Sequence, residues 1–297
     1  MMNAPNAVAG QDANAEIARI DGLASKTTTY CGPDARMVWR RWGSGPKLVL
    51  IHGGAGSWMH WIRNIEVLAR SHTVWAPDLP GFGDSDLPRE GLDADTLYPW
   101  VSDGIRELIG DDPFDLVGFS FGGLVAALVA AERPANLRRL VLVSIASMGL
   151  LSENPVLRPM RGVTDPAERR DILRFNLNAL MLHDGNAIDD LAIAVQGASA
   201  PRDRVKNRKV VFTDILLRIR SEWRCPVFAI WGRQDLLYRE QIDKLMSVSA
   251  TLGLTDRVVL EDAGHWLQYE KADEFNRVLQ EMLERRLAGT EGGDHGA

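Results

Sequence analysis

Cysteine and long apolar runs are scarce in this chain, and basic residues are fewer than acidic ones. Among its 297 residues only Cys31 and Cys225 are cysteines, and their separation fits no metal-ligand spacing. We expect two reduced thiols, because a disulfide framework uses several closely spaced pairs. No apolar run approaches the roughly 20 residues of a membrane span, and residues 1–16 lack the basic start and apolar core of a signal peptide. The sequence therefore predicts a cytoplasmic protein without a membrane partner.

Basic residues are outnumbered by acidic ones. Lys and Arg total 34 against 40 Asp and Glu, which gives a net charge of −6. Extended nucleic-acid binding needs clustered positive charge, so we expect no nucleic-acid partner. The one basic run, PRDRVKNRKVV, is interpreted as a solvated face, with attraction of an anionic substrate as the alternative. Whether copies of the chain form a homo-oligomer stays open.

Eight short segments rich in β-forming residues punctuate the chain. They span residues 26–31, 36–42, 47–52, 72–78, 114–119, 137–145, 226–232 and 256–262. Most lack polar alternation, which is typical of strands covered on both faces of a parallel sheet. The first two flank the turn GPDA and predict a hairpin, and helical patterns follow most of the others. This order predicts an α/β fold with an open, doubly wound, mostly parallel eight-stranded sheet covered by helices on both faces.

The alternation of strands and helices is interrupted at residues 148–223. This stretch contains helix-like segments such as AERRDILRFNLNALML but no convincing strand, so we interpret it as an inserted α-helical cap. The core is then expected in two parts, residues 25–147 and 224–288. The small, polar residues 1–24 are expected to be disordered, and residues 289–297 to form a flexible tail.

The segment GFSFG, residues 118–122, fits the pattern G-x-S-x-G between a predicted strand and a predicted helix. A sharp strand-to-helix turn holds its serine in a strained backbone conformation, so the flanking positions must be small. The turn lifts the Ser120 hydroxyl above the carboxyl ends of the strands, where ligands bind in open α/β folds. A lone hydroxyl is a poor nucleophile, so this hypothesis requires a base, an acid and an oxyanion hole.

His265 and Asp235 are the candidate base and acid. His265, in DAGHWLQYE, follows the last predicted strand, and Asp235, in WGRQDLLY, follows the strand before it. Both loops leave the carboxyl edge of the sheet, and the chain order Ser, Asp, His suits this architecture. The competing residues are the histidines His52, His60, His72, His183 and His295 and the aspartates Asp243, Asp256 and Asp262, and Asp235 could instead cap a helix.

An oxyanion hole needs backbone N–H groups beside the nucleophile. The Phe121 N–H, immediately after Ser120, is the first candidate. The second comes from the loop HGGAGSW after the third strand, where we choose Gly54, with Ala55 as the alternative. This loop could also be an ordinary turn before a helix, but it lacks the Lys and Ser/Thr of a phosphate-binding loop.

Five motifs together carry a family resemblance. In order and approximate spacing, HGGAGSW, DLPGFGDSD, GFSFGG, GRQD and AGHW resemble the α/β-hydrolase fold superfamily over residues 47–287. The resemblance implies a catalytic triad of Ser120, Asp235 and His265 and a cap that shapes the pocket. It also implies a structural role for the glycine-rich turn from Asp78 to Asp86. Such a reaction requires neither a metal nor an organic cofactor.

The resemblance also bears on the substrate. Serine at the elbow disfavours the epoxide hydrolases and haloalkane dehalogenases of this fold, which use aspartate there. The segments AGHWLQYEKADEFN and LMLHDGNAIDD are similar to carbon–carbon bond hydrolases that cleave meta-ring-fission products. That family has asparagine where this chain has Phe119, and arginine where our alignment places Ala198.

We therefore expect a serine hydrolase acting on a small, apolar ester, lactone or thioester. A carbon–carbon bond hydrolase is the alternative, and a non-catalytic ligand-binding protein is the alternative of another class. Trp58, Phe119 and Trp266 are candidates for lining the substrate pocket, and for the tryptophans aromatic packing under a helix is at least as good an explanation.

Overall fold

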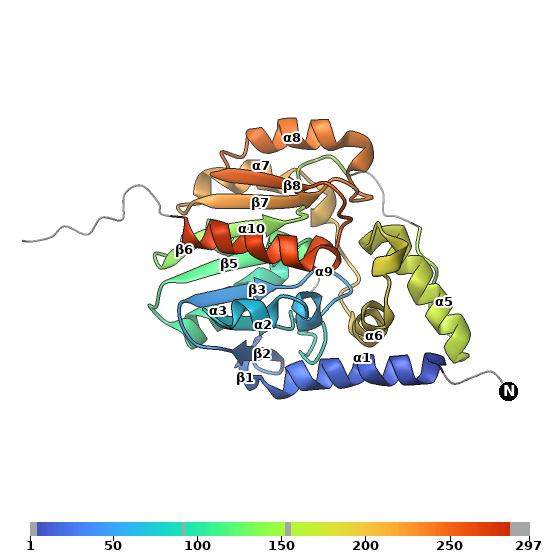
Figure 1. The fold of residues 1–297 in the computed structure, drawn as a ribbon. Coiled ribbons are helices and arrows are strands. Elements are labelled where there is room, and N and C mark those ends of the chain that lie inside the picture. The colour runs from blue at the N-terminus through green and yellow to red at the C-terminus, as the bar shows by residue number, and fades with distance from the viewer. Residues whose placement is uncertain (1–4, 91–92, 152–155, 286–297) are drawn as a thin grey trace, which may run out of the picture.

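The computed structural model describes residues 5–90, 93–151 and 156–285, and its centre is one eight-stranded sheet (Figure 1). The strands are β1 (Ser25–Tyr30), β2 (Arg36–Trp42), β3 (Lys47–Ile51), β4 (Thr73–Pro77), β5 (Phe114–Phe119), β6 (Leu137–Val143), β7 (Val227–Gly232) and β8 (Asp256–Leu260). Each lies within one of the eight predicted segments, apart from Ser25 at the start of β1.

The sheet has the order β1-β2-β4-β3-β5-β6-β7-β8. β1 and β2 form the predicted antiparallel hairpin, β2 is antiparallel to β4, and all the remaining pairs are parallel. The predicted open, mostly parallel sheet is confirmed. Its carboxyl edge collects the loops that follow β3, β5, β7 and β8.

Helices pack on both faces of this sheet. The α-helices are α1 (Pro5–Gly22), α2 (Ile65–Leu68), α3 (Ala94–Ile109), α4 (Phe121–Ala131), α5 (Pro166–Asn176), α6 (Asp190–Ser199), α7 (Ile215–Ile219), α8 (Ile242–Ala250), α9 (Leu267–Glu270) and α10 (Ala272–Glu284). Shorter helical turns are η1 (Trp58–Trp61), the π-helical η2 (Leu177–Met181), η3 (Gly185–Ala187), η4 (Ala200–Arg202), η5 (Val210–Phe212), η6 (Arg220–Glu222) and η7 (Arg239–Gln241).

Two hydrophobic cores result, one on each face. Successive residues of a strand point to opposite faces, so in β3 Leu48 and Leu50 enter one core while Val49 and Ile51 enter the other. The Val49 side packs against α3, α4, α7 and α8. The Leu48 side packs against α2 and α10, which lie in front of the sheet in Figure 1. Burial on both faces explains the continuous apolar runs of the central strands.

Between β6 and β7 the described residues form helices and turns but no strand. α5, η2 and α6 stand beyond the carboxyl edge of the sheet (Figure 1). α7 instead packs against α4, and the Trp223 indole donates to the Ala127 carbonyl at 2.9 Å. The predicted cap boundary at residue 223 therefore lies inside a segment that has already rejoined the core.

The prediction that residues 1–24 are disordered is wrong for residues 5–22, which form α1. This helix lies against α6 (Figure 1). Its sequence is small and polar, so its stability comes from tertiary contacts. Ile20 is buried and its carbonyl accepts from the Trp42 indole at 2.8 Å, while Asp21 pairs with Arg40. The predicted tail, residues 289–297, lies outside the described residues.

No helix in the described part of the chain is long and apolar enough to cross a lipid bilayer.

Candidate active site

The turn between β5 and α4 holds Ser120 at φ 52° and ψ −118°, a conformation that non-glycine residues rarely adopt. The flanking glycines make this turn possible. A Cβ added to Gly118 would lie 2.5 Å from the Gly122 carbonyl oxygen, and one added to Gly122 would lie 2.1 Å from the His52 carbonyl oxygen. The predicted steric role of both glycines is confirmed.

Ser120 and two distant side chains form one hydrogen-bonded chain. His265 Nδ1 lies 2.7 Å from Asp235 Oδ2, and His265 Nε2 lies 2.9 Å from Ser120 Oγ. A carboxylate only accepts, so Nδ1 carries the proton and Nε2 presents its lone pair to the serine hydroxyl. Asp235 is fully buried, and its second oxygen accepts from the Leu237 N–H at 3.0 Å. This arrangement fixes the imidazole as an acceptor for the Ser120 proton.

The sheet brings these residues together. Asp235 follows β7 and His265 follows β8, so both loops leave the same edge as the elbow. Of the histidines in the described residues, His265 is the one that bonds to Ser120. His295 lies outside the described residues.

The candidate oxyanion donors lie beside the elbow. Phe121 is the first residue of α4, so its N–H is one of the first-turn donors that have no acceptor within the helix. The Ala55 N–H already donates to Asp203 Oδ2 of the inserted segment at 3.1 Å. This engagement favours Gly54 over Ala55 as the second donor.

Two buried histidines hold the backbone of Gly53, the residue before Gly54. His52 Nε2 accepts from the Leu79 N–H at 2.9 Å, so its Nδ1 carries the proton and donates to the Gly53 oxygen at 2.8 Å. The Gly53 N–H donates to His60 Nδ1 at 3.2 Å. In a trans peptide the carbonyl and the next N–H point in opposite directions, so this clamp directs the Gly54 N–H away from His52. Burial lowers the pKa of His52, and it lowers that of His60 well below its ordinary value, which keeps both rings neutral.

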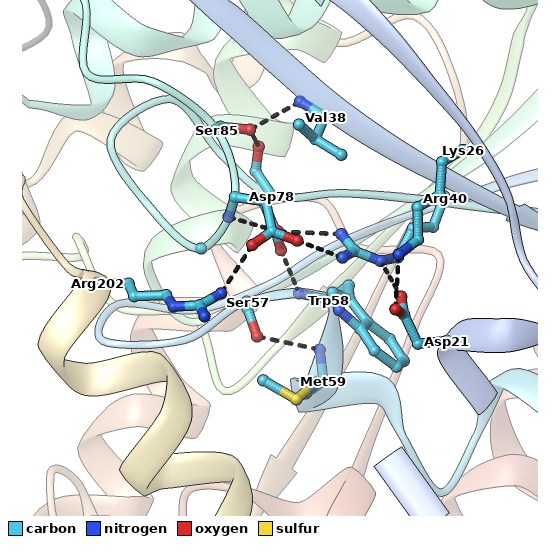
Figure 2. Close-up of polar contacts among 12 residues, drawn as sticks. Asp21, Lys26, Val38, Arg40, Ser57, Trp58, Met59, Asp78, Ser85 and Arg202 are labelled. Atoms are coloured by element: carbon cyan, nitrogen blue, oxygen red, sulfur yellow. Dashed lines mark hydrogen bonds and ion pairs between the residues drawn. The ribbon is translucent and has the colours of Figure 1, made fainter. Parts of the chain in front are cut away.

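Asp78 fixes the far end of the same loop (Figure 2). Its Oδ1 accepts from the Trp58 N–H at 2.8 Å, and its Oδ2 accepts from Arg40 at 3.1 Å. Both side chains are almost fully buried, and Arg40 also donates to Asp21 of α1 at 2.6 Å. The turn after β4 thus has a supporting role, as the family resemblance implies.

The basic run PRDRVKNRKVV lies on the seam between the inserted segment and the core. Arg202 donates to Asp84 of the turn after β4 at 2.7 Å, and Arg204 donates to backbone carbonyls of that turn. Arg208 pairs with Asp203. The predicted solvated face therefore also joins the inserted segment to the core.

Glu270 is a residue that the sequence did not single out. Its Oε2 accepts from the Gly264 N–H at 2.6 Å, and its Oε1 accepts from the Asp184 N–H at 2.6 Å. Gly264 precedes His265, and Asp184 belongs to the inserted segment, so one carboxylate joins the two. An acidic residue in a short helix is common, and nothing in the sequence marks this one.

A cavity of about 450 Å³ lies between the candidate oxyanion loop, residues 52–58, and the inserted segment, residues 148–223. Gly54 and Ala55 line it from the core. The inserted segment contributes apolar and cationic side chains, among them Leu157, Met160, Leu180, Met181, Arg158, Arg161 and Arg169. Surface grooves of about 610 and 820 Å³ also occur, but neither is lined by Gly54 or Ala55. A small molecule with an apolar part suits the cavity beside the site.

The predicted pocket residues do not line this cavity. Trp58, Phe119 and Trp266 are at most 3% exposed. The Phe119 ring centre lies 5.1 Å from that of His265, and Trp266 stacks on Tyr269 at 4.1 Å. The pocket assignment is wrong because these side chains pack in the core beneath the site, which was the alternative explanation for the two tryptophans.

Known proteins agree with this architecture. The model of a family described as the alpha/beta hydrolase family matches residues 48–278. A 2-hydroxy-6-oxo-6-phenylhexa-2,4-dienoate hydrolase of Burkholderia cepacia is 29% identical in an alignment of 261 residues that covers 81% of this chain and 88% of that protein. A 2-hydroxy-6-oxononadienedioate/2-hydroxy-6-oxononatrienedioate hydrolase of Burkholderia vietnamiensis is 29% identical over 86% of this chain and 93% of its own length.

A solved structure shows the same fold. A carboxylesterase from Bacillus subtilis superposes with a TM-score of 0.69 over 94% of this chain and all of its own, at 18% identity. The family model covers most of the chain, including the elbow and both loops that carry Asp235 and His265. This chain is therefore an enzyme of the alpha/beta hydrolase family.

Proposed function

We propose that the protein is a serine hydrolase that cleaves a small, largely apolar ester, lactone or thioester through an acyl-enzyme. The observation that carries this proposal is the unbroken hydrogen-bonded chain from Asp235 through His265 to Ser120. The nearby cavity, with apolar side chains around the oxyanion loop, accommodates such a substrate.

The reaction follows from this geometry. Ser120 Oγ attacks the carbonyl carbon while His265 Nε2 takes the hydroxyl proton, and Asp235 stabilises the resulting imidazolium. The N–H groups of Phe121 and Gly54 donate to the oxyanion. His265 then protonates the leaving oxygen or sulfur as its bond to the acyl carbon breaks. A water deprotonated by His265 hydrolyses the acyl-serine and restores the enzyme.

Ester hydrolysis by purified variants tests the proposal. With p-nitrophenyl esters of short acids, Ser120→Ala is expected to lower kcat by roughly 10⁴-fold or more. Ser147→Ala is the matched control, because Ser147 is also a buried serine, lies after β6 and has no role in the proposed reaction. Substantial hydrolysis by Ser120→Ala would refute the proposal.

A carbon–carbon bond hydrolase is the second candidate, since the two relatives described above bear names of that class. The family's cap arginine is aligned with Ala198, which is exposed in α6. The carboxylate of such a substrate would have to be held by other cations, and Arg158, Arg161 and Arg169 line the cavity.

The two candidate functions predict different substrate preferences. Purified protein is offered 2-hydroxy-6-oxo-6-phenylhexa-2,4-dienoate and a p-nitrophenyl ester, and kcat/KM is compared. A higher kcat/KM for the dienoate, lost on combined substitution of the three arginines by Gln, would establish the second candidate. A higher kcat/KM for the ester supports the first.

A further inference from the structure

Arg208 lies against both residues of the proposed oxyanion hole. A Cβ added to Gly54 would lie 3.2 Å from Arg208 Nε and 3.4 Å from Cζ, so the guanidinium rests on the backbone of Gly54. The same Cζ lies 5.5 Å from the ring centre of Phe121. A permanent positive charge thus stands beside the place where the proposed reaction develops negative charge.

Asp203 holds this guanidinium and the oxyanion loop together. Its carboxylate pairs with Arg208, and its Oδ2 also accepts from the Ala55 N–H at 3.1 Å. The Asp203 side chain is only 10% exposed, and its other oxygen accepts from the Val205 N–H at 3.2 Å. One carboxylate therefore sets the distance between the cation and the loop.

The ion pair with Asp203 uses Nη2 of Arg208 and does not involve its Nε–H. Nε is buried and has no hydrogen-bond partner in the part of the chain that the structure describes. Leaving a buried donor unpaired is costly, particularly on a charged group, and such groups often have a functional reason. Nε is also the Arg208 atom nearest to the added Gly54 Cβ.

We propose that Arg208 is a catalytic residue that adds a cationic N–H donor to the oxyanion hole. This inference rests on the proposed serine-hydrolase function. The carbonyl oxygen of a neutral ester gains a full charge only as the tetrahedral intermediate forms, so a cation there acts mainly on kcat. Asp203 neutralises part of the Arg208 charge. We therefore expect Arg208 to contribute less to kcat than a backbone donor of the oxyanion hole does.

The test uses a neutral p-nitrophenyl ester with full-length protein. Arg208→Gln is expected to lower kcat by about 10- to 100-fold with KM changed by less than about threefold. Arg208→Lys, which keeps the charge but lacks Nε–H, should lose less. The matched control is Arg202→Gln, which breaks an ion pair on the same seam. Its kcat should stay within about twofold of wild type because surface pairs contribute little.

A second measurement separates catalysis from structure. A neutral aryl boronic acid forms a tetrahedral adduct with a catalytic serine, whereas a neutral aryl amide resembles the ground state. Arg208→Gln should raise Ki for the boronic acid by about the factor lost in kcat and leave Ki for the amide unchanged. Equal changes in both, or no change in kcat, would overturn the role of Arg208.

The two proposals fail in different ways. If Ser120→Ala retains ester hydrolysis, the proposed function itself is wrong. If Ser120→Ala abolishes hydrolysis while Arg208→Gln keeps the wild-type kcat, only the assignment of Arg208 is wrong.

Discussion

The turn at Ser120, which is the proposed nucleophile elbow, and the candidate oxyanion loop lie side by side but are stabilised in different ways. The elbow is built by its own sequence, since Gly118 and Gly122 clear the space that the strained Ser120 conformation requires. The oxyanion loop is held from outside, by Asp78 twenty residues away and by Asp203 of the inserted segment. We infer that elbow substitutions disrupt folding, whereas substitutions around the loop alter activity and stability in smaller steps.

The largest effect is expected at the elbow. In Gly122→Ala the new Cβ would meet the backbone oxygens of His52 at 2.1 Å and Ile51 at 2.7 Å, and backbone cannot move aside cheaply. We expect a loss of more than about 3 kcal/mol in the free energy of unfolding, or insoluble protein. Urea unfolding followed by circular dichroism measures it.

Gly185→Ala is the control for this substitution, because nothing lies within 4 Å of a Cβ at that position. Its free energy of unfolding should stay within about 0.5 kcal/mol of wild type. Equal stability of the two variants would show that the elbow is not sterically constrained.

The next largest effect is expected at Asp78, which supports the candidate oxyanion loop. Asp78→Asn removes the charge that faces Arg40 inside the protein, although Asp21 and Asp84 still pair with that guanidinium. We expect a loss of about 2–3 kcal/mol in the free energy of unfolding and a lower kcat. Asp256→Asn, at an exposed pair with Arg285, should cost less than about 1 kcal/mol. Similar losses for both would contradict the supporting role.

A smaller effect is expected where the His265 loop meets the inserted segment. Glu270→Gln keeps one acceptor oxygen and turns an NH₂ group toward the other N–H, so either Gly264 or Asp184 loses its partner. We expect kcat to fall about tenfold through misplacement of His265. Glu261→Gln, which weakens an exposed pair with Arg233, is the control for loss of a glutamate charge. An unchanged kcat in Glu270→Gln would mean that this tie does not position His265.

The smallest effect is expected at His60, which makes the free energy of unfolding depend on pH. Burial keeps its pKa below the unfolded value of about 6.5, so below that pH the unfolded chain binds more protons than the folded one. Stability is therefore lost as pH falls, by up to about 1.4 kcal/mol per pH unit for this group.

His60→Phe removes the titrating group and keeps a ring against Phe119 and Trp266. Urea unfolding between pH 7.5 and 5 should give a shallower slope than wild type, even though the variant starts less stable because the Gly53 N–H loses its acceptor. Parallel slopes would show that the pKa of His60 does not differ between the folded and the unfolded protein.

The same contrast explains what the sequence could predict. The strands, the elbow and the association of Ser120, Asp235 and His265 follow from local patterns and from the edge at which parallel strands end. The supports at Asp203 and Glu270 could not be found, because each depends on a contact between segments that the sequence does not place together. The helix α1 was missed for the same reason, and the sequence alone could not decide whether the aromatic side chains line a pocket or pack in the core.

The central claim is that His265 activates Ser120 as the nucleophile. The most direct measurement is the rate of covalent labelling by a fluorophosphonate, with the modified residue identified by peptide mass spectrometry. We expect a single adduct on Ser120 and a labelling rate that falls by roughly a thousandfold or more in His265→Ala. Labelling of a different residue, or an unchanged rate in His265→Ala, would contradict it.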